Sequence, residues 1–244
     1  MFIGLSKLVD RLLGLIMWPL AAAVIYYYSE IFSLFITTVS IFIENASPIY
    51  LAGAAFFLIF RFNFLPFLKF PSSWNNKKGK YSFASRLDTW EHERAHWLFA
   101  ILTFKFGSRI EVFDKPNEKG HAGYFHSSTN SYNWLITIGP YFFPTFTFLL
   151  LPLFLIPYEP LYPFLEFALG WSISFHIIQN IVDVKKNWNP SVKGSYSDLT
   201  TLTKEYPNQT RFSIFRSHVF AIVMIPALNL IIFSFVLLFL MKNL

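Results

Sequence analysis

The sequence predicts a mainly α-helical, polytopic membrane protein with about five to seven membrane helices and a small membrane-associated β-hairpin. Hydrophobic residues make up 54% of the 244 residues and charged residues only 14%, against about a quarter in a soluble domain. Long apolar runs alternate with short segments rich in Lys and Arg. The net charge of +6 is therefore explained by loops that follow the positive-inside rule and contact anionic headgroups. The sequence contains no nucleic-acid-binding motif, and the lipid bilayer is the expected solvent for much of the surface.

The N-terminal region, residues 1–87, is expected to hold membrane spans followed by a basic loop. Its first apolar run, about 12–43, is longer than the roughly 20 residues that cross a bilayer, and it is interrupted at 26–30. This run forms either one long tilted helix or two shorter helices. It also exceeds signal-peptide length and has no clear cleavage site, so we expect it to be retained. A second span is expected from about 49 to 70.

Residues 88–207 are predicted to form the core of the protein. Segment 88–106 has the period of an α-helix. Alternating apolar and polar residues in 109–113 and 122–125 predict two short strands that pair as a hairpin. The remaining expected spans are about 134–158, 161–182 and, in the C-terminal region 208–244, 214–241.

Two segments, 69–88 and 183–216, carry a clear excess of Lys and Arg, and both therefore favour the cytoplasmic side of a membrane. If helix 88–106 crossed completely, three crossings would place these segments on opposite sides. The charges therefore predict that this helix does not cross fully, or that the hairpin re-enters from the cytoplasmic side.

A His-Glu-x-x-His motif lies on helix 88–106, formed by His92, Glu93 and His96. Residues four apart share one helix face, so both imidazoles can bind one zinc ion, and Glu93 beside them can take a proton from water. Ionisable residues are costly at membrane depth and mark functional sites there, which favours a metal site over a chance match. The chain has no cysteine, so every protein ligand must come from His, Asp or Glu.

A catalytic zinc ion needs a third protein ligand and an open position. One zincin class takes this ligand from a helical Glu that is followed four residues later by Asp, a pattern that Glu159, Glu166 and Glu205 all lack. The other candidates are the downstream acids and four histidines: His121, His126, His176 and His218. Of these histidines, the two on the hairpin are expected at the surface and the last at the membrane interface.

A polar face runs along the expected span 161–182 and just beyond it, with His176, Asn180 and Asp183 at positions i, i+4 and i+7. Such a face usually turns towards the protein interior or a water-filled cavity. These residues either orient a ligating imidazole or hydrogen-bond a substrate, or they make a polar contact between helices near the membrane boundary.

Five blocks follow one another along the core: the motif helix, then 106–112, 119–124, 136–140 and a Ser-Asp block at 197–202. In this order they resemble the site-2-protease-like intramembrane metalloproteases, in particular their short bacterial branch. The middle blocks resemble the two strands of that family's hairpin and the glycine-containing start of its next helix. The last block resembles the one from which the short branch draws its acidic ligand, although it lacks the Asn-Pro-Asp-Gly or Leu-Asp-Gly setting of larger members.

The resemblance implies Asp198 as the third ligand, zinc as the metal, and a bacterial inner membrane as the location. It also implies hydrolysis of a peptide bond in or near a transmembrane segment of a partner membrane protein. The alternative for Asp198 is a helix N-terminal residue with Ser197 as its cap. Two alternatives for the function are a non-catalytic membrane scaffold of the same fold and a gluzincin-type membrane protease.

Overall fold

The computed structural model describes residues 2–62, 83–113, 123–129, 133–188, 198 and 211–243. Several predicted features lie outside these residues: the basic loop 71–82, His121, Ser197, the 199–207 part of the Ser-Asp block, and Glu205. The side chain of His218 is also outside the description. The described chain is mainly helical, as the composition predicts.

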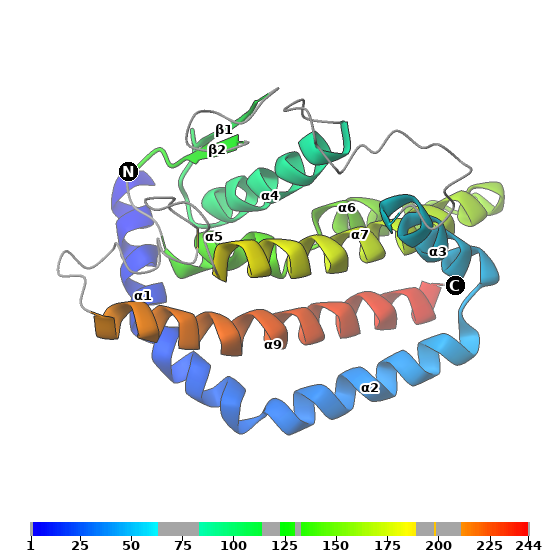
Figure 1. The fold of residues 1–244 in the computed structure, drawn as a ribbon, viewed down its shortest axis with the longest axis horizontal. Helices are drawn as coiled ribbons and strands as arrows, with labels where there is room; N and C mark the ends of the chain where they lie inside the picture. The colour runs from blue at the N-terminus through cyan, green and yellow to red at the C-terminus, as the bar shows by residue number, and fades with distance from the viewer. Residues whose placement is uncertain are drawn as a thin grey trace.

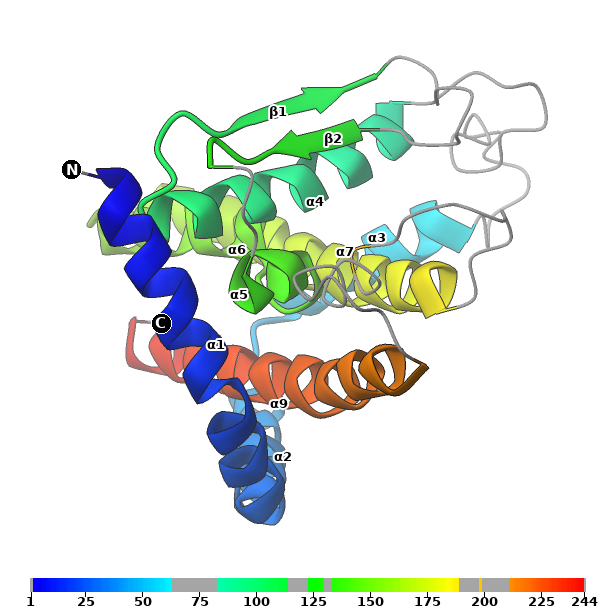
Figure 2. The same ribbon diagram turned by 90° about the vertical axis from the view of Figure 1, so that its left-hand side faces the viewer.

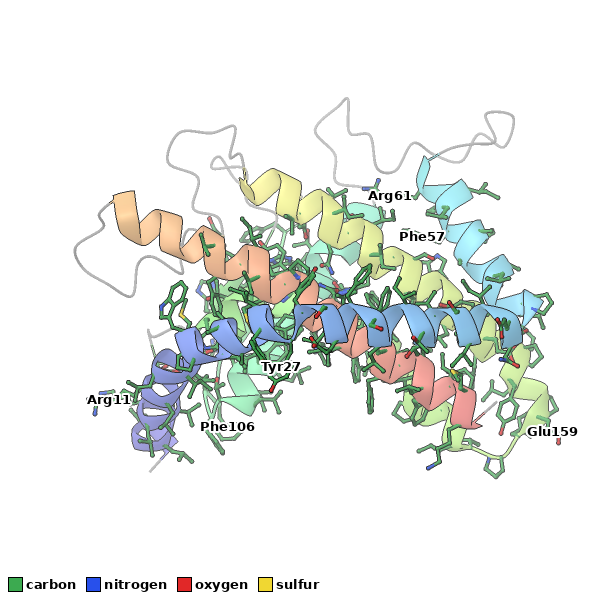
Figure 3. The ribbon with its side chains drawn as sticks, turned by 90° about the horizontal axis from the view of Figure 1, so that it is seen from below. Arg11, Tyr27, Phe57, Arg61, Phe106 and Glu159 are labelled. Carbon is green, nitrogen blue, oxygen red and sulfur yellow. The ribbon has the colours of Figure 1, made fainter. Side chains whose placement is uncertain are left out.

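The first apolar run forms two helices, α1 (Phe2–Tyr26) and α2 (Tyr28–Asn45), so the two-helix alternative is the one observed. Tyr27 lies at the junction between them (Figure 3). The helix α3 (Pro48–Phe62) follows α2 after a bend of 110°. This bend forms because Ala46 adopts an extended conformation and the Ser47 hydroxyl accepts a hydrogen bond from the Ile49 N–H at the start of α3.

The motif helix α4 (Phe83–Leu102) is followed by two strands, β1 (Arg109–Val112) and β2 (Gly123–His126). Phe104 and Gly107 have positive φ angles of 63° and 87°, so the chain turns sharply after the helix. The strands pair antiparallel, with Arg109 opposite His126, which confirms the predicted hairpin. The hairpin lies over α4 (Figure 2).

The expected span 134–158 is instead a series of short helical pieces bent by 84°. These pieces are α5 (Trp134–Ile138), η1 (Gly139–Tyr141), α6 (Thr145–Leu150) and η2 (Leu151–Leu155). Pro140, Pro144 and Pro152 explain the breaks, since proline has no N–H to donate within a helix. Next come η3 (Glu159–Leu161) and the long helix α7 (Tyr162–Trp188), and α9 (Arg211–Asn243) ends the described chain.

Two glycines allow α3 and α7 to cross in close contact. A methyl group on Gly53 would overlap the carbonyl oxygen of Phe167, and one on Gly170 would overlap that of Tyr50. Because the obstacles are backbone atoms of the facing helix, neither position accepts a larger residue without separating the helices. This crossing fixes the direction of α7, which carries Asp183 to the site described below.

The helix α9 connects two apolar clusters of the interior. Its first half packs with α1, α4 and α5 in a cluster that includes Phe99, Trp134 and Phe220. Its second half packs with α2, η2 and the start of α7 around Phe154, Leu169 and Leu240. Figure 1 shows α9 between α2 and α7, and the sequence of α9 is apolar on all sides. Some of these apolar side chains, such as Ile222 and Phe235, are exposed, as expected for a helix that could face lipid.

Three described helices are long and apolar enough to cross a membrane: Ile3–Tyr26, Glu159–Val184 and Val219–Lys242. The number rises to five if each of the two bent pairs, α2 with α3 and α5–η1 with α6–η2, forms one span. Within the described part of the chain, the range is therefore three to five spans, against the about five to seven that the sequence predicts. Among the described helices, α4 does not have the length and apolar composition of a candidate span.

Candidate metal centre

The helix α4 presents the two motif histidines side by side. The ring centroids of His92 and His96 lie 5.0 Å apart with an angle of 78° between the rings. Glu93 and His96 are buried, and His92 is partly buried. The two imidazoles therefore lie on one helix face, as the i, i+4 spacing predicts.

Asp198 completes a group of three metal-binding side chains. Its Oδ2 lies 2.8 Å from His92 Nε2, and its Oδ1 lies 3.6 Å from His96 Nε2. One ligand atom from each of the three residues can be chosen so that all lie within 4.8 Å of one another. Among the described residues, this group could hold a metal ion.

The other nitrogen of each imidazole is held by an acceptor. His96 Nδ1 donates to the carbonyl oxygen of Ile136 at 2.7 Å, and His92 Nδ1 faces Asp183 Oδ2 at 3.2 Å. Because a carbonyl only accepts, His96 carries a proton on Nδ1, and Nε2 is the nitrogen that faces Asp198. An imidazole held by a carboxylate or a carbonyl at one nitrogen is the usual arrangement of a metal ligand, so these residues fit a metal ion.

The pKa values of the group follow from its contacts. Burial alone would lower the pKa of His92, but hydrogen bonds and charges of Asp183 and Asp198 hold it well above 6.5. Burial alone would raise the pKa of Asp198, but the two histidines hold it well below 3.8. Without a metal, His92 and Asp198 therefore form an ion pair in which the proton occupies a metal-binding position.

Glu93 faces the hairpin. A methyl group on Gly123 of β2 would lie 3.1 Å from Glu93 Cγ and 2.7 Å from Thr89 Cγ2, so only glycine allows this approach. Burial raises the pKa of Glu93 above 4.5, while the charges of His96 and His92 oppose the rise. Glu93 thus lies in an enclosed place beside both histidines, where a carboxylate binds a proton more readily than in water.

Two aromatic rings form the walls of the centre. The Tyr141 hydroxyl donates to Asp198 Oδ2 at 3.1 Å, and Phe125 of β2 stacks on His96 with centroids 5.6 Å apart. Tyr141 comes from η1, the turn that Pro140 forces on the chain. The centre is therefore built from α4, β2, η1 and Asp198, and α7 contributes Asp183.

A second polar cluster lies beside the centre, with two almost fully buried members, Glu91 and His176. Glu91 Oε1 accepts from the Thr145 N–H at 3.2 Å and lies 3.5 Å from His176 Nδ1, and the side chains of Glu91 and His176 are 2% and 1% exposed. Asn180 Nδ2 lies 2.8 Å from His176 Nε2 and 3.4 Å from Asn229 Oδ1. Asn229 Nδ2 donates to two carbonyl oxygens, so Asn229 Oδ1 is the acceptor that faces Asn180 Nδ2. Asn180 Nδ2 in turn donates to His176 Nε2, which places the His176 proton on Nδ1, the nitrogen that faces Glu91.

The structure brings together His92, Glu93, His96, Asp198 and, against His92, Asp183. It places His176 and Asn180 in the second cluster, where they link α7 to α4 and α9. His126 is exposed and lies 3.8 Å from Glu111 on the hairpin. Glu159 and Glu166 are not part of the metal-binding group found among the described residues.

Some residues around the centre are not indicated by the motif. Gln179 donates to Asp183 Oδ2 at 3.1 Å, and it could have been found because it lies one helical turn before Asp183. Glu91 could have been found as an acid next to the motif in a largely apolar helix. Tyr141 and the Ile136 carbonyl have no sequence signal, because their roles depend on how the chain bends after Gly139.

Comparisons with known proteins give no relative for this chain: no family model, no curated protein and no solved structure matches it.

Proposed function

We propose that the protein is an intramembrane zinc endopeptidase that hydrolyses a peptide bond in or near a transmembrane segment of a partner protein. The observation that carries the proposal is the group His92, His96 and Asp198, with both imidazoles held at Nδ1 and Glu93 buried beside them. This set also matches the residues that the resemblance to site-2-protease-like enzymes implies.

Zinc is the metal that suits these ligands best. Two imidazole nitrogens and one carboxylate, with no thiolate, are typical of a catalytic zinc site that keeps a position for water or substrate. Calcium and magnesium prefer sites made of oxygen ligands. When bound, zinc supplies a Lewis acid that polarises the scissile carbonyl and increases the acidity of water.

The remaining chemistry belongs to the side chains. Glu93 takes a proton from the attacking water and gives it to the amide nitrogen as the peptide C–N bond breaks, so the products are a carboxylic acid and an amine. Asp183 and the Ile136 carbonyl keep the imidazoles in one orientation during this step. Tyr141 donates to Asp198 and holds its carboxylate against the histidines.

A transmembrane substrate must unwind before it is cut, because a helix hides its carbonyl groups in its own hydrogen bonds. The hairpin lies next to the centre, with Gly123 against Glu93 and Phe125 against His96. An extended substrate segment that adds to the hairpin as a further strand would therefore pass beside Glu93.

The variant Glu93→Gln tests the proposal. It should retain zinc, because Glu93 is not a ligand, and it should lose cleavage of single-span substrates by about 100-fold or more. Zinc is measured by metal analysis of the purified protein and cleavage by gel mobility. The matched control is Glu30→Gln, an exposed acid on α2 away from the hairpin, which should cleave like the wild type.

His96→Ala and Asp198→Ala should both lose zinc, whereas Glu166→Ala should keep it. Zinc loss in Glu166→Ala with retention in Asp198→Ala would favour the gluzincin alternative. A wild-type protein that binds zinc but cleaves no substrate would favour the scaffold.

A further inference from the structure

The chain just after α4 holds a completely buried lysine. Lys105 Nζ donates to Asp10 Oδ2 at 2.6 Å, and to Ser6 Oγ and Thr129 Oγ1 at 3.1 Å each, and its side chain is 0% exposed. A buried charge is costly unless it is paired, so this ion pair holds α1 against the end of α4. The carboxylate of Asp10 is thereby kept in one position.

The other oxygen of this carboxylate binds the start of α5. Asp10 Oδ1 accepts from Asn133 Nδ2 at 2.8 Å, and Asn133 is 2% exposed. Asn133 Oδ1 in turn accepts from the Ile136 N–H at 3.0 Å, which makes Asn133 the N-cap of α5. Because Asp10 only accepts, it must face the amide nitrogen of Asn133, and the amide oxygen is left to cap the helix.

The first turn of α5 ends on the metal centre. Ile136, whose N–H is capped by Asn133, is also the residue whose carbonyl oxygen accepts from His96 Nδ1 at 2.7 Å. The helix α5 has only five residues, so its own hydrogen bonds do little to fix its orientation. Two contacts fix the orientation of α5 instead. One is the cap by Asn133, and the other is the hydrogen bond that the Trp134 indole donates to the Leu13 carbonyl of α1 at 2.8 Å.

We propose that Asp10 is a positioning residue for the metal ligand His96, acting through Asn133 and the first turn of α5. The N-terminal helix is then part of the metal centre and not only a membrane anchor. Removing the contact between Asp10 and Asn133 loosens the Ile136 carbonyl, and with it the proton position and orientation of the His96 ring. The inference rests on the metal-binding half of the proposed function and is independent of peptide hydrolysis.

The test compares two variants of the full chain that both lack the buried ion pair. Lys105→Met removes the cation but keeps the Asp10 carboxylate as an acceptor for Asn133. The double variant Asp10→Ala/Lys105→Met removes that contact as well, without leaving an unpaired charge. A third variant, Asn133→Ser, keeps an N-cap hydroxyl but is too short to contact Asp10. Glu30→Ala, on the exposed surface of α2, is the control for loss of an acid from the N-terminal helices.

Zinc affinity is measured by competition with a chelator, and the His96 ring by ¹⁵N NMR of the metal-free protein. We expect the double variant to bind zinc about 3- to 10-fold more weakly than Lys105→Met, less than the about 10- to 100-fold typical of a direct partner of a ligand. Asn133→Ser should lose a similar factor in zinc affinity. In the triple variant Asp10→Ala/Lys105→Met/Asn133→Ser, the further loss of zinc affinity beyond Asn133→Ser should be no larger than the loss in Lys105→Met alone. The Nδ1 proton signal of His96 should weaken in the same variants, and Glu30→Ala should match the wild type.

Equal zinc affinity and unchanged His96 signals in Lys105→Met and the double variant would overturn the inference. Because Asn133→Ser keeps the ion pair, an unaltered centre in that variant would overturn it too, even if the double variant does not fold. A wild-type protein that binds no zinc would overturn both this inference and the proposed function. A zinc-loaded wild type that cleaves nothing would overturn the proposed function alone.

Discussion

At the scale of single residues, His92 is where protons and a metal ion compete. Its raised pKa stabilises the metal-free fold below the usual value of 6.5, and this stabilisation is lost as the pH rises through the raised value. Asp198 acts in the opposite sense. Its lowered pKa stabilises the fold above 3.8, and this stabilisation is lost as the pH falls through the lowered value. The stabilisation of the fold by this ion pair is therefore greatest between the two ordinary pKa values, 3.8 and 6.5, and is lost beyond the two shifted values.

Zinc binding should therefore release a proton from His92 near neutral pH and become tighter as the pH rises. The expected slope approaches about tenfold per pH unit until the raised pKa of His92 is passed. Asp183→Asn removes one of the two carboxylates that raise this pKa, so it should reduce proton release at neutral pH. Calorimetry in buffers of different ionisation enthalpy measures the release. Zinc binding without proton release at neutral pH would contradict the ion pair.

The close approach of Gly123 to Glu93 predicts that a larger residue at position 123 displaces the hairpin. In Gly123→Ala the added methyl group would lie 2.7 Å from Thr89 Cγ2 and 3.1 Å from Glu93 Cγ, both on α4, so the hairpin must move away from α4. We expect a loss of about 1–3 kcal/mol of stability and a large loss of cleavage, with zinc still bound. Thermal unfolding in detergent and metal analysis check this. Gly4→Ala, which meets no atom within 4 Å, should have neither effect.

At the scale of elements, the close crossing of α3 and α7 determines where α7 places Asp183 in the metal centre. In Gly53→Ala or Gly170→Ala the new methyl group meets backbone atoms of the facing helix, which cannot turn aside as a side chain can. Each variant should unfold at lower temperature, with a cost of about 1–3 kcal/mol, and should bind zinc more weakly because α7 carries Asp183. Gly14→Ala on α1 has open space around it and serves as the control. Unchanged stability in Gly170→Ala would show that the helices cross differently.

The elements that follow a regular pattern could be predicted from the sequence. The period of 88–106 predicts α4, and the alternation in 109–113 and 122–125 predicts β1 and β2 to within one residue. The bend in 134–158 could not be predicted from composition, because an apolar run looks the same whether it is straight or broken. Proline is tolerated within some membrane helices, as Pro226 in α9 shows, so Pro140 and Pro144 alone do not predict the break.

The residues of the metal centre likewise fall into those that local sequence spacing predicts and those that only tertiary contacts determine. His92, Glu93 and His96 could be predicted because they lie within one helix, where spacing determines geometry. Asp198 was implied only by resemblance, since it lies 106 residues from His92 and no local pattern connects them. Asp183 was among the residues of the polar face, but the choice between orienting an imidazole and linking helices depends on how α7 packs. Asp10 and Tyr141 depend entirely on tertiary contacts.

At the scale of the whole molecule, α7 relates the centre to the bilayer. The roughly 20 residues from Tyr162 to Asp183 correspond to about 30 Å, the thickness of the hydrocarbon core. If α7 crosses the bilayer over this length, Asp183 and the metal centre would lie near one membrane surface and Glu159 near the other. Figure 3 shows Glu159 at one end of the molecule and Arg61, which interacts electrostatically with Asp183, away from that end.

Because the chain has no native cysteine, this arrangement can be tested by single substitutions. Glu159→Cys and Lys242→Cys lie at neighbouring ends of α7 and α9, which pack together in the second apolar cluster. A membrane-impermeant maleimide should label both from the same side of sealed vesicles. An impermeant chelator should remove zinc only from the opposite side. Labelling of the two cysteines from different sides would contradict antiparallel crossing of α7 and α9.

The distance along the chain between the two halves of the centre has a consequence for biosynthesis. A ribosome that has produced α4 has made both histidines, yet Asp183 and Asp198 follow 91 and 106 residues after His92. Metal capture must therefore wait until α7 has been inserted and folded back against α4. A nascent chain that ends before Asp183 lacks both of these carboxylates, so stalled chains of that length should carry no tightly bound metal.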